Sequence, residues 1–133
     1  MIGVMEIRKV LLAEDEEDIQ KVARMSLQFQ GHWEVVVASN GEECLSKVGA
    51  ERPDLILLDA MMPRMDGYET CRRLKADPAT RDIPIIFLTA KAQESEIRKG
   101  LELGAVGYLV KPFDPMRLAA QILQILESSG GEK

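Results

Sequence analysis

Four short apolar segments of the sequence each end at residues that carry a charge or a hydroxyl group. Uninterrupted apolar runs that are bounded by turn signals and separated by helical patterns are typical of parallel strands covered on both faces. We therefore predict that these segments are strands of one buried sheet. Segment 10–13 is followed by Glu14 and Asp15, 55–58 by Asp59, 85–88 by Thr89 and Ala90, and 108–110 by Lys111 and Pro112.

The stretches between these segments show helical periodicity together with residues that start and stop helices. Asn40 followed by Glu43, and Asp66 followed by Glu69, match N-cap patterns, and Asp114-Pro115 resembles a cap with a first-turn proline. The first helix places Ile19, Val22, Ala23 and Leu27 on one face and is expected to end at Gly31; later helices cover 68–76 and 95–103, the latter ending at Gly104. The predicted strands are 8–13, 34–38, 55–59, 85–88 and 107–110.

Strands that alternate with helices, joined by right-handed crossovers, predict an α/β fold with a doubly wound five-stranded parallel sheet and helices on both faces. In the flavodoxin-like order 2-1-3-4-5, ligands bind at the carboxyl ends of the strands, in the crevice between strands one and three. That order places Glu14, Asp15 and Asp59 side by side. We expect one domain over residues 1–127, a polar tail over 128–133, and no attached output domain.

Composition limits the function classes. The 133 residues carry a formal net charge of −5, which argues against a nucleic-acid-binding surface because such surfaces need clustered Lys and Arg. No apolar run approaches the roughly 20 residues that span a bilayer, and Arg8 and Lys9 interrupt the only signal-peptide-like stretch. We therefore expect a soluble, cytoplasmic protein. Cys44 and Cys71 are widely spaced within helical patterns, which favours two buried thiols over a disulfide.

The crowded carboxylates suggest a metal site. Each carboxylate disfavours ionisation of its neighbours, so the charged cluster requires a cation. A partly open site with oxygen ligands alone favours Mg²⁺, or Mn²⁺. Taken singly, Asp59 could be a loop residue, the acids from Glu14 to Asp18 a solvated helix start, Thr89 a cap and Lys111 a surface turn residue. Their coincidence at the ends of consecutive core strands favours a shared chemical role.

Taken together, these residues resemble the receiver domain of two-component response regulators over about residues 7–126. The resemblance lies in Glu14-Asp15, in Asp59 with Met61-Met62-Pro63 and Asp66-Gly67 behind it, in Thr89-Ala90, and in Lys111-Pro112-Phe113. It implies that Asp59 accepts a phosphoryl group from a sensor histidine kinase or phosphotransfer protein. It also implies Asp15 and Asp59 as metal ligands, the Met61 carbonyl as a third, and Glu14 acting mostly through bound water. Lys111, the Thr89 hydroxyl and the Ala90 N–H would stabilise the phosphoryl oxygens.

The same resemblance implies a conformational switch. Thr89 would move toward the phosphoryl group and the Tyr108 ring would turn into the vacated space, rearranging the fourth helix, fifth strand and last helix. In the last helix, Met116, Ala119, Ala120 and Leu123 widen the apolar surface, either as a partner face or as a broad core stripe. We expect a protein effector and a homodimer formed on phosphorylation, with no direct nucleic acid or membrane partner. Met61 and Lys91 would tune the lifetime of the phosphoryl group.

Three other functions compete with this interpretation. A flavodoxin-like FMN binder needs a phosphate-cradling first loop, but here that loop is a run of acids from Glu14 to Asp18. A haloacid-dehalogenase-type phosphatase needs a second Asp where Met61 stands. A receiver-like scaffold that is never phosphorylated is the third alternative. The favoured interpretation is a protein that is not an enzyme and assists only its own phosphorylation and dephosphorylation.

Overall fold

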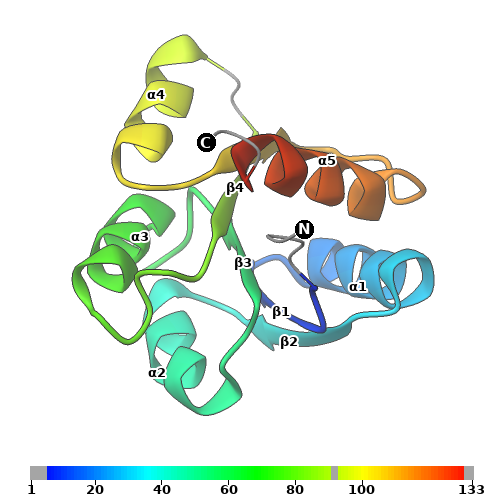
Figure 1. The fold of residues 1–133 in the computed structure, drawn as a ribbon, viewed down its shortest axis with the longest axis horizontal. Coiled ribbons are helices and arrows are strands. Elements are labelled where there is room, and N and C mark those ends of the chain that lie inside the picture. Colours follow the sequence, from blue (N-terminus) through cyan, green and yellow to red (C-terminus); the bar gives the residue numbers. More distant parts are fainter. Residues whose placement is uncertain (1–5, 91–92, 131–133) are drawn as a thin grey trace.

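Five parallel strands form the centre of the computed structural model, which describes residues 6–90 and 93–130 (Figure 1). The sheet order is β2-β1-β3-β4-β5, as the sequence predicted. Residues that belong to different strand–helix units therefore meet at the edges of one sheet. The strands are β1 Lys9–Ala13, β2 Glu34–Ala38, β3 Leu55–Asp59, β4 Ile85–Thr89 and β5 Gly107–Val110; the helices are α1 Glu17–Ser26, η1 Leu27–Gly31, α2 Gly41–Glu51, α3 Gly67–Ala76, α4 Glu94–Glu102 and α5 Leu118–Gly130.

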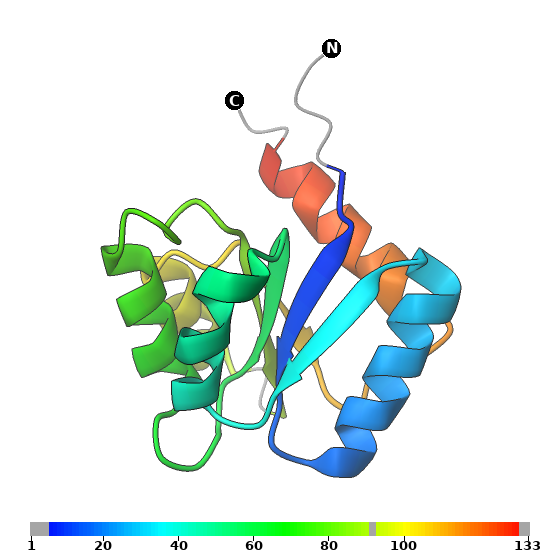
Figure 2. The ribbon, with the colours of Figure 1, turned by 90° about the horizontal axis from the view of Figure 1, so that it is seen from below.

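Helices cover both faces of the sheet (Figure 2). Helices α1 and α5 lie on one face, and α2, α3 and α4 lie on the other. Because side chains alternate along a strand, each central strand contributes to two cores. In β3, Leu55 and Leu57 pack with the α1 and α5 side, whereas Ile56 and Leu58 pack with the α2 and α3 side. This double coverage explains the uninterrupted apolar runs in the sequence.

Two predicted helix starts are confirmed in detail. The Asn40 side chain accepts a hydrogen bond from the Glu43 N–H at 2.8 Å, and Asp66 accepts one from the Glu69 N–H at 2.9 Å. The two N-caps are thus set by the local sequence. The Glu69 side chain pairs with Arg72 and Arg73 of α3.

The first helical segment ends at Gly31, as predicted, but its last part is not an α-helix. A five-residue π-helix, η1, follows α1, and the left-handed residue beyond it is His32 with φ 59°. Gly31 is required there for a different reason: the Trp33 ring lies where a Cβ would be. Val22, expected on the buried face, is exposed.

The prediction that Asp114-Pro115 starts the last helix is wrong. Helix α5 begins at Leu118, and the Asp114 carboxylate instead caps a turn by accepting the Met116 N–H at 2.9 Å. The Pro115 carbonyl accepts a hydrogen bond from the Ser26 hydroxyl on α1, which fixes that turn. Helix α5 continues to Gly130, so the polar stretch expected from Ser128 begins within the last helical turns.

Two further predictions concern buried thiols and membrane spans. Cys44 and Cys71 are free and buried, and burial raises the pKa of these thiols to about 12 and about 11. Such thiols are inert core groups. Across residues 6–90 and 93–130, none of the helices has the length and apolar character needed to cross a bilayer.

Candidate functional site

The polar ends of the strands meet at one edge of the sheet. Glu14 and Asp15 follow β1, Asp59 ends β3, Thr89 ends β4 and Lys111 follows β5. Strands β1 and β3 are hydrogen-bonded neighbours, with Ala13 opposite Leu58. This is where the chain's winding direction reverses, so the predicted juxtaposition of the acids is confirmed.

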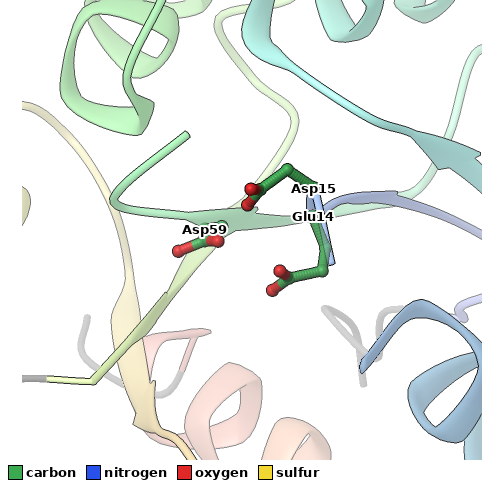
Figure 3. A group of neighbouring side chains, drawn as sticks. All are labelled: Glu14, Asp15 and Asp59. Atoms are coloured by element: carbon green, nitrogen blue, oxygen red, sulfur yellow. The ribbon is translucent and has the colours of Figure 1, made fainter. Parts of the chain in front are cut away.

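Three carboxyl groups surround a common space at this edge (Figure 3). One oxygen each of Glu14, Asp15 and Asp59 lies within 4.8 Å of the others. Glu14 is completely buried and Asp59 is 3% exposed, whereas Asp15 is exposed. The group therefore offers oxygen donors alone and is open on one side, which fits a hard divalent cation that keeps some of its water.

Lys111 bridges the two buried acids. Its Nζ lies 3.2 Å from Glu14 Oε1 and 3.3 Å from Asp59 Oδ2. The Met61 N–H donates to the other oxygen of Asp59 at 3.1 Å, and the Glu16 N–H donates to Glu14 at 3.0 Å. Among the described residues, every buried side-chain nitrogen and oxygen has a hydrogen-bond partner. The buried charges are thus paired rather than isolated.

The electrostatics of the site favour an added cation. Burial, and next the charge of Glu14, raise the pKa of Asp59 to about 7, although the Met61 N–H and Lys111 oppose this. Burial by itself lowers the pKa of Lys111, but the charges of Asp59 and Glu14 outweigh it and raise that pKa. Lys111 therefore stays protonated, while Asp59 needs further positive charge to be fully ionised at neutral pH.

Gly67 fixes the loop behind Asp59. A Cβ at this position would overlap the carbonyl oxygen of Asp59, and the Gly67 N–H donates to the Ala60 carbonyl at 3.0 Å. Helix α3 therefore begins directly against the backbone at the end of β3. The motif Asp66-Gly67 is visible in the sequence, but no role was predicted for its glycine; a glycine directly after an N-cap was the available signal.

A cavity of about 640 Å³ opens at the carboxylates. Asp15, Asp59, Met61, Ala90 and Lys111 line it, so it collects most of the predicted site residues. Its remaining wall is largely apolar and includes Ile19, Val22, Pro112 and Phe113.

Thr89 and Tyr108 line a different space, a small cavity of about 10 Å³ beneath α4. Thr89 is buried, and Tyr108 at the surface is 38% exposed. The predicted switch pair therefore shares one wall beside the site. Lys91, expected to influence phosphoryl lifetime, lies outside the described residues.

One supporting residue had no role in the sequence prediction. The Gln20 side-chain amide, on α1, donates to the backbone carbonyl of Glu14 and to the Ser39 hydroxyl at 3.3 Å. It thereby ties the loop that carries both acids to the end of β2. Such a long-range contact to backbone leaves no periodic signal in the sequence.

Another cavity, of about 910 Å³, lies between β5 and α5. It is larger than the one at the carboxylates, but no member of the acid cluster lines it. Asp114, Gln121 and Gln124 are among its lining residues, together with backbone of β5. The acid cluster therefore makes the cavity of about 640 Å³ the candidate functional site.

Comparison with known proteins agrees with this geometry. A family model described as the response regulator receiver domain matches residues 10–123. The chain is 43% identical, over 92% of its length, to the alkaline phosphatase synthesis transcriptional regulatory protein PhoP of Bacillus subtilis. It is 41% identical, over 92% of its length, to the phosphate regulon transcriptional regulatory protein PhoB of Pseudomonas aeruginosa. These alignments cover 50% and 53% of the relatives, so the chain spans about half the length of the curated relatives it matches.

Solved structures give the same result. The chemotaxis protein CheY4 of Vibrio cholerae superposes with a TM-score of 0.84 at 32% identity, covering 90% of this chain and 99% of that one. A response regulator from Chloroflexus aurantiacus superposes with a TM-score of 0.83 at 34% identity, covering 92% and 99%. The similarity thus extends over nearly the whole of both chains.

Proposed function

The chain belongs to the response regulator receiver domain family, and from this premise we propose that Asp59 is the residue that accepts the phosphoryl group. The observation that carries the proposal is the position of Asp59: it is buried at the reversal point of the sheet, bonded to Lys111 and grouped with two further acids. Of the three acids, Asp59 alone ends a core strand, and it borders the open cavity.

In the proposed transfer, an Asp59 carboxylate oxygen attacks the phosphorus of a phosphohistidine on a kinase or phosphotransfer protein. The P–N bond breaks as the P–O bond forms, and the leaving imidazole keeps the electron pair and takes a proton. Lys111 donates to the phosphoryl oxygens, which it can reach because its ammonium already lies 3.3 Å from Asp59. The Thr89 hydroxyl and the Ala90 N–H are the other proposed donors.

The residues that would hold Mg²⁺, or Mn²⁺, are Asp15 and Asp59 through carboxylates, Met61 through its carbonyl, and Glu14 mostly through water. When bound, the ion supplies positive charge that offsets the acid cluster and the phosphoryl oxygens. The oxygen-only donor set and the exposed Asp15 support this assignment. Glu14 has a second proposed role, because its pairing with the Lys111 ammonium holds that group beside Asp59.

We propose that the protein assists only its own phosphorylation and dephosphorylation. Multiple turnover on an external phosphate ester needs a second acid near the nucleophile, and Met61 stands two residues after Asp59 instead. Met61 is exposed and lines the cavity, so its side chain is placed to influence the access of water to the phosphoryl group. We propose that Lys91 has a similar influence.

The proposed output is a rearrangement of the surface formed by α4, β5 and α5. Thr89 and Tyr108, which share a cavity wall beneath α4, would couple it to the site. A sensor histidine kinase or phosphotransfer protein is the proposed donor and a protein effector the proposed target. Because the two relatives named above are transcriptional regulators, we propose an effector that acts in transcription. Direct contact of residues 1–133 with nucleic acid remains disfavoured by their net charge of −5.

Intact mass measurement after incubation with acetyl phosphate and Mg²⁺ tests the proposal. The expected result is one added phosphoryl group on the wild type and none on Asp59→Asn. Asp82→Asn is the matched control, because Asp82 is an exposed aspartate just before β4, at the opposite end of that strand from Thr89. A wild type that takes up no phosphoryl group would instead support the scaffold alternative.

A further inference from the structure

Tyr68 connects the loop behind Asp59 to helix α4. Its hydroxyl donates a hydrogen bond to Glu96 Oε1 at 2.7 Å, and the Lys99 ammonium lies 4.3 Å from the centre of its ring. The ring also packs on Phe87 of β4, with centroids 5.2 Å apart. Gly67 lies directly against the backbone of Asp59 at the end of β3. Because Tyr68 is the next residue, its position is set by that strand.

Helix α4 buries few of its side chains. Of its residues Glu94–Glu102, all within the described part of the chain, Gly100 alone is buried. Gly100 lies against the Phe87 ring, where a Cβ would come within 2.8 Å of a ring carbon. A helix that buries so little apolar surface gains little from the hydrophobic effect. The Tyr68–Glu96 hydrogen bond, to a charged acceptor, therefore adds materially to the contacts that hold α4 in place.

The small cavity beneath α4 makes this hydrogen bond relevant to switching. Tyr68, Phe87, Thr89, Glu96 and Tyr108 all line it. Its volume of about 10 Å³ is near the minimum for a single water molecule, so a phenol ring cannot enter without enlarging it. Movement of Thr89 toward the site would add only the volume of its small side chain, which is less than a phenol ring needs. An inward turn of Tyr108 would therefore also require α4 to move away from the sheet, which would lengthen or break the Tyr68–Glu96 hydrogen bond.

We propose that the Tyr68–Glu96 hydrogen bond is an autoinhibitory latch that holds α4 over the cavity and keeps Tyr108 at the surface. The latch opposes the rearrangement of α4, β5 and α5. That rearrangement belongs to the proposed function, so the role of the latch in switching rests on it. By linkage, a contact that stabilises the resting state weakens binding of any ligand that favours the other state. Removing the latch must then raise the affinity of the site for a phosphoryl mimic, although Tyr68 and Glu96 lie outside that site.

The composition allows a direct test, because Tyr68 and Tyr108 are the two tyrosines of the sequence. In protein labelled with 3-fluorotyrosine, the variant Tyr68→Phe identifies the ¹⁹F resonance of Tyr108. Glu96→Ala removes the acceptor of the latch and keeps both tyrosines. Glu94→Ala is the matched control, since Glu94 lies in the same helical turn but pairs with Arg98 of its own helix at 3.2 Å.

We expect the resting Tyr108 resonance of Glu96→Ala to move toward its position in wild type saturated with beryllium fluoride and Mg²⁺. Amide exchange in α4 should accelerate about fivefold, and beryllium fluoride should bind about fivefold more tightly, the factor that corresponds to about 1 kcal/mol. Tyr68→Phe should show the same changes in exchange and affinity, because it retains the ring and loses only the hydroxyl. Glu94→Ala should match the wild type.

Glu96→Ala and Tyr68→Phe variants with wild-type exchange and affinity would overturn the latch. Equal changes in Glu94→Ala would overturn it too, because they would reflect helix propensity alone. Absence of beryllium fluoride binding by wild type would contradict the proposed function, and amide exchange in the resting variants would still decide the latch.

Discussion

The Lys111 ammonium lies 3.3 Å from Asp59 Oδ2, although the residues are 52 positions apart in the sequence. The contact exists because Asp59 ends β3 and Lys111 follows β5, two strands further along the same sheet edge, beyond β4. Glu14 completes the arrangement by holding the same ammonium at 3.2 Å. One side-chain cation thus neutralises part of a buried acidic pair, and the stability of the domain and its chemistry depend on the same atoms.

Replacing Lys111 with Met should destabilise the metal-free protein by about 3 kcal/mol at neutral pH, because two buried carboxylates lose their cation. Part of this loss should be recovered when Mg²⁺ is added. Urea denaturation with and without Mg²⁺ measures both effects. Lys47→Met, which removes an ion pair between half-exposed side chains on α2 and a hydrogen bond to the Val37 carbonyl, should cost only about 1 kcal/mol. Equal losses of stability in the two variants would show that the buried ion pairs of Lys111 contribute no more than an exposed pair does.

The stability of the metal-free protein should depend on pH through Asp59. Its pKa rises from 3.8 to about 7 on folding, so the native state binds more protons than the unfolded state between these values. The stabilisation is complete below pH 3.8 and is lost as the pH rises through about 7. Wild type should therefore lose about 2 kcal/mol relative to Asp59→Asn between about pH 5 and pH 8. Parallel stability curves for the two proteins over that range would contradict the assignment.

Gly67→Ala should destabilise the protein by about 2 kcal/mol and slow acetyl phosphate uptake, because its Cβ would displace the Asp59 backbone. Gly49→Ala is the control. A Cβ at Gly49 would meet nothing within 4 Å, so this change within α2 should stabilise the protein by about 0.5 kcal/mol. Thermal unfolding and phosphorylation rates distinguish the two. A Gly67→Ala protein that is phosphorylated at the wild-type rate would refute the positioning role.

The success of sequence-based prediction followed the range of the interactions involved. The strands and the caps at Asn40 and Asp66 were predicted correctly, because apolar periodicity and local hydrogen bonds record them. The strand order, also correct, came from the flavodoxin-like architecture that the alternation of strands and helices suggested. The start of α5 was missed, because the Pro115 carbonyl bonds to Ser26, far away in the sequence. The hydrogen bond between Tyr68 and Glu96 likewise joins two different helices, α3 and α4. Apolar periodicity indicates which residues are buried, but it does not indicate which polar side chains of different elements will be in contact.

Asp15→Asn should weaken Mg²⁺ binding at least about tenfold while leaving the metal-free fold intact. Asp15 is exposed, so its charge contributes repulsion to the acid cluster without filling any core position. Titration calorimetry gives the affinity, and urea denaturation without metal should show stability equal to or slightly above that of wild type. Unchanged magnesium affinity would remove Asp15 from the proposed ligand set.

The sequence left two interpretations of the apolar residues in the last helix, a partner face or a broad core stripe. The structure supports each of them for some of these residues. Ala119 is 5% exposed and belongs to the core, whereas Leu123 is 48% exposed and Ala120 is also exposed. Met116, which was expected in this helix, is exposed in the turn that precedes it. The part that remains outside the core is therefore available to a partner or a second copy. Leu123→Gln should change the free energy of unfolding by less than about 0.5 kcal/mol, because a solvent-facing site loses little on substitution.

If this face carries the proposed phosphorylation-linked self-association, sedimentation of the phosphorylated proteins should show a dimer for wild type and a monomer for Leu123→Gln. Gln124→Ala is the control, because Gln124 is an exposed neighbour on the same helix that adds no apolar surface. A phosphorylated Leu123→Gln protein that dimerises like wild type would move the output surface away from this side of α5. Since the substitution leaves the carboxylates and Lys111 untouched, loss of dimer with normal phosphoryl uptake would separate the output face from the chemistry that drives it.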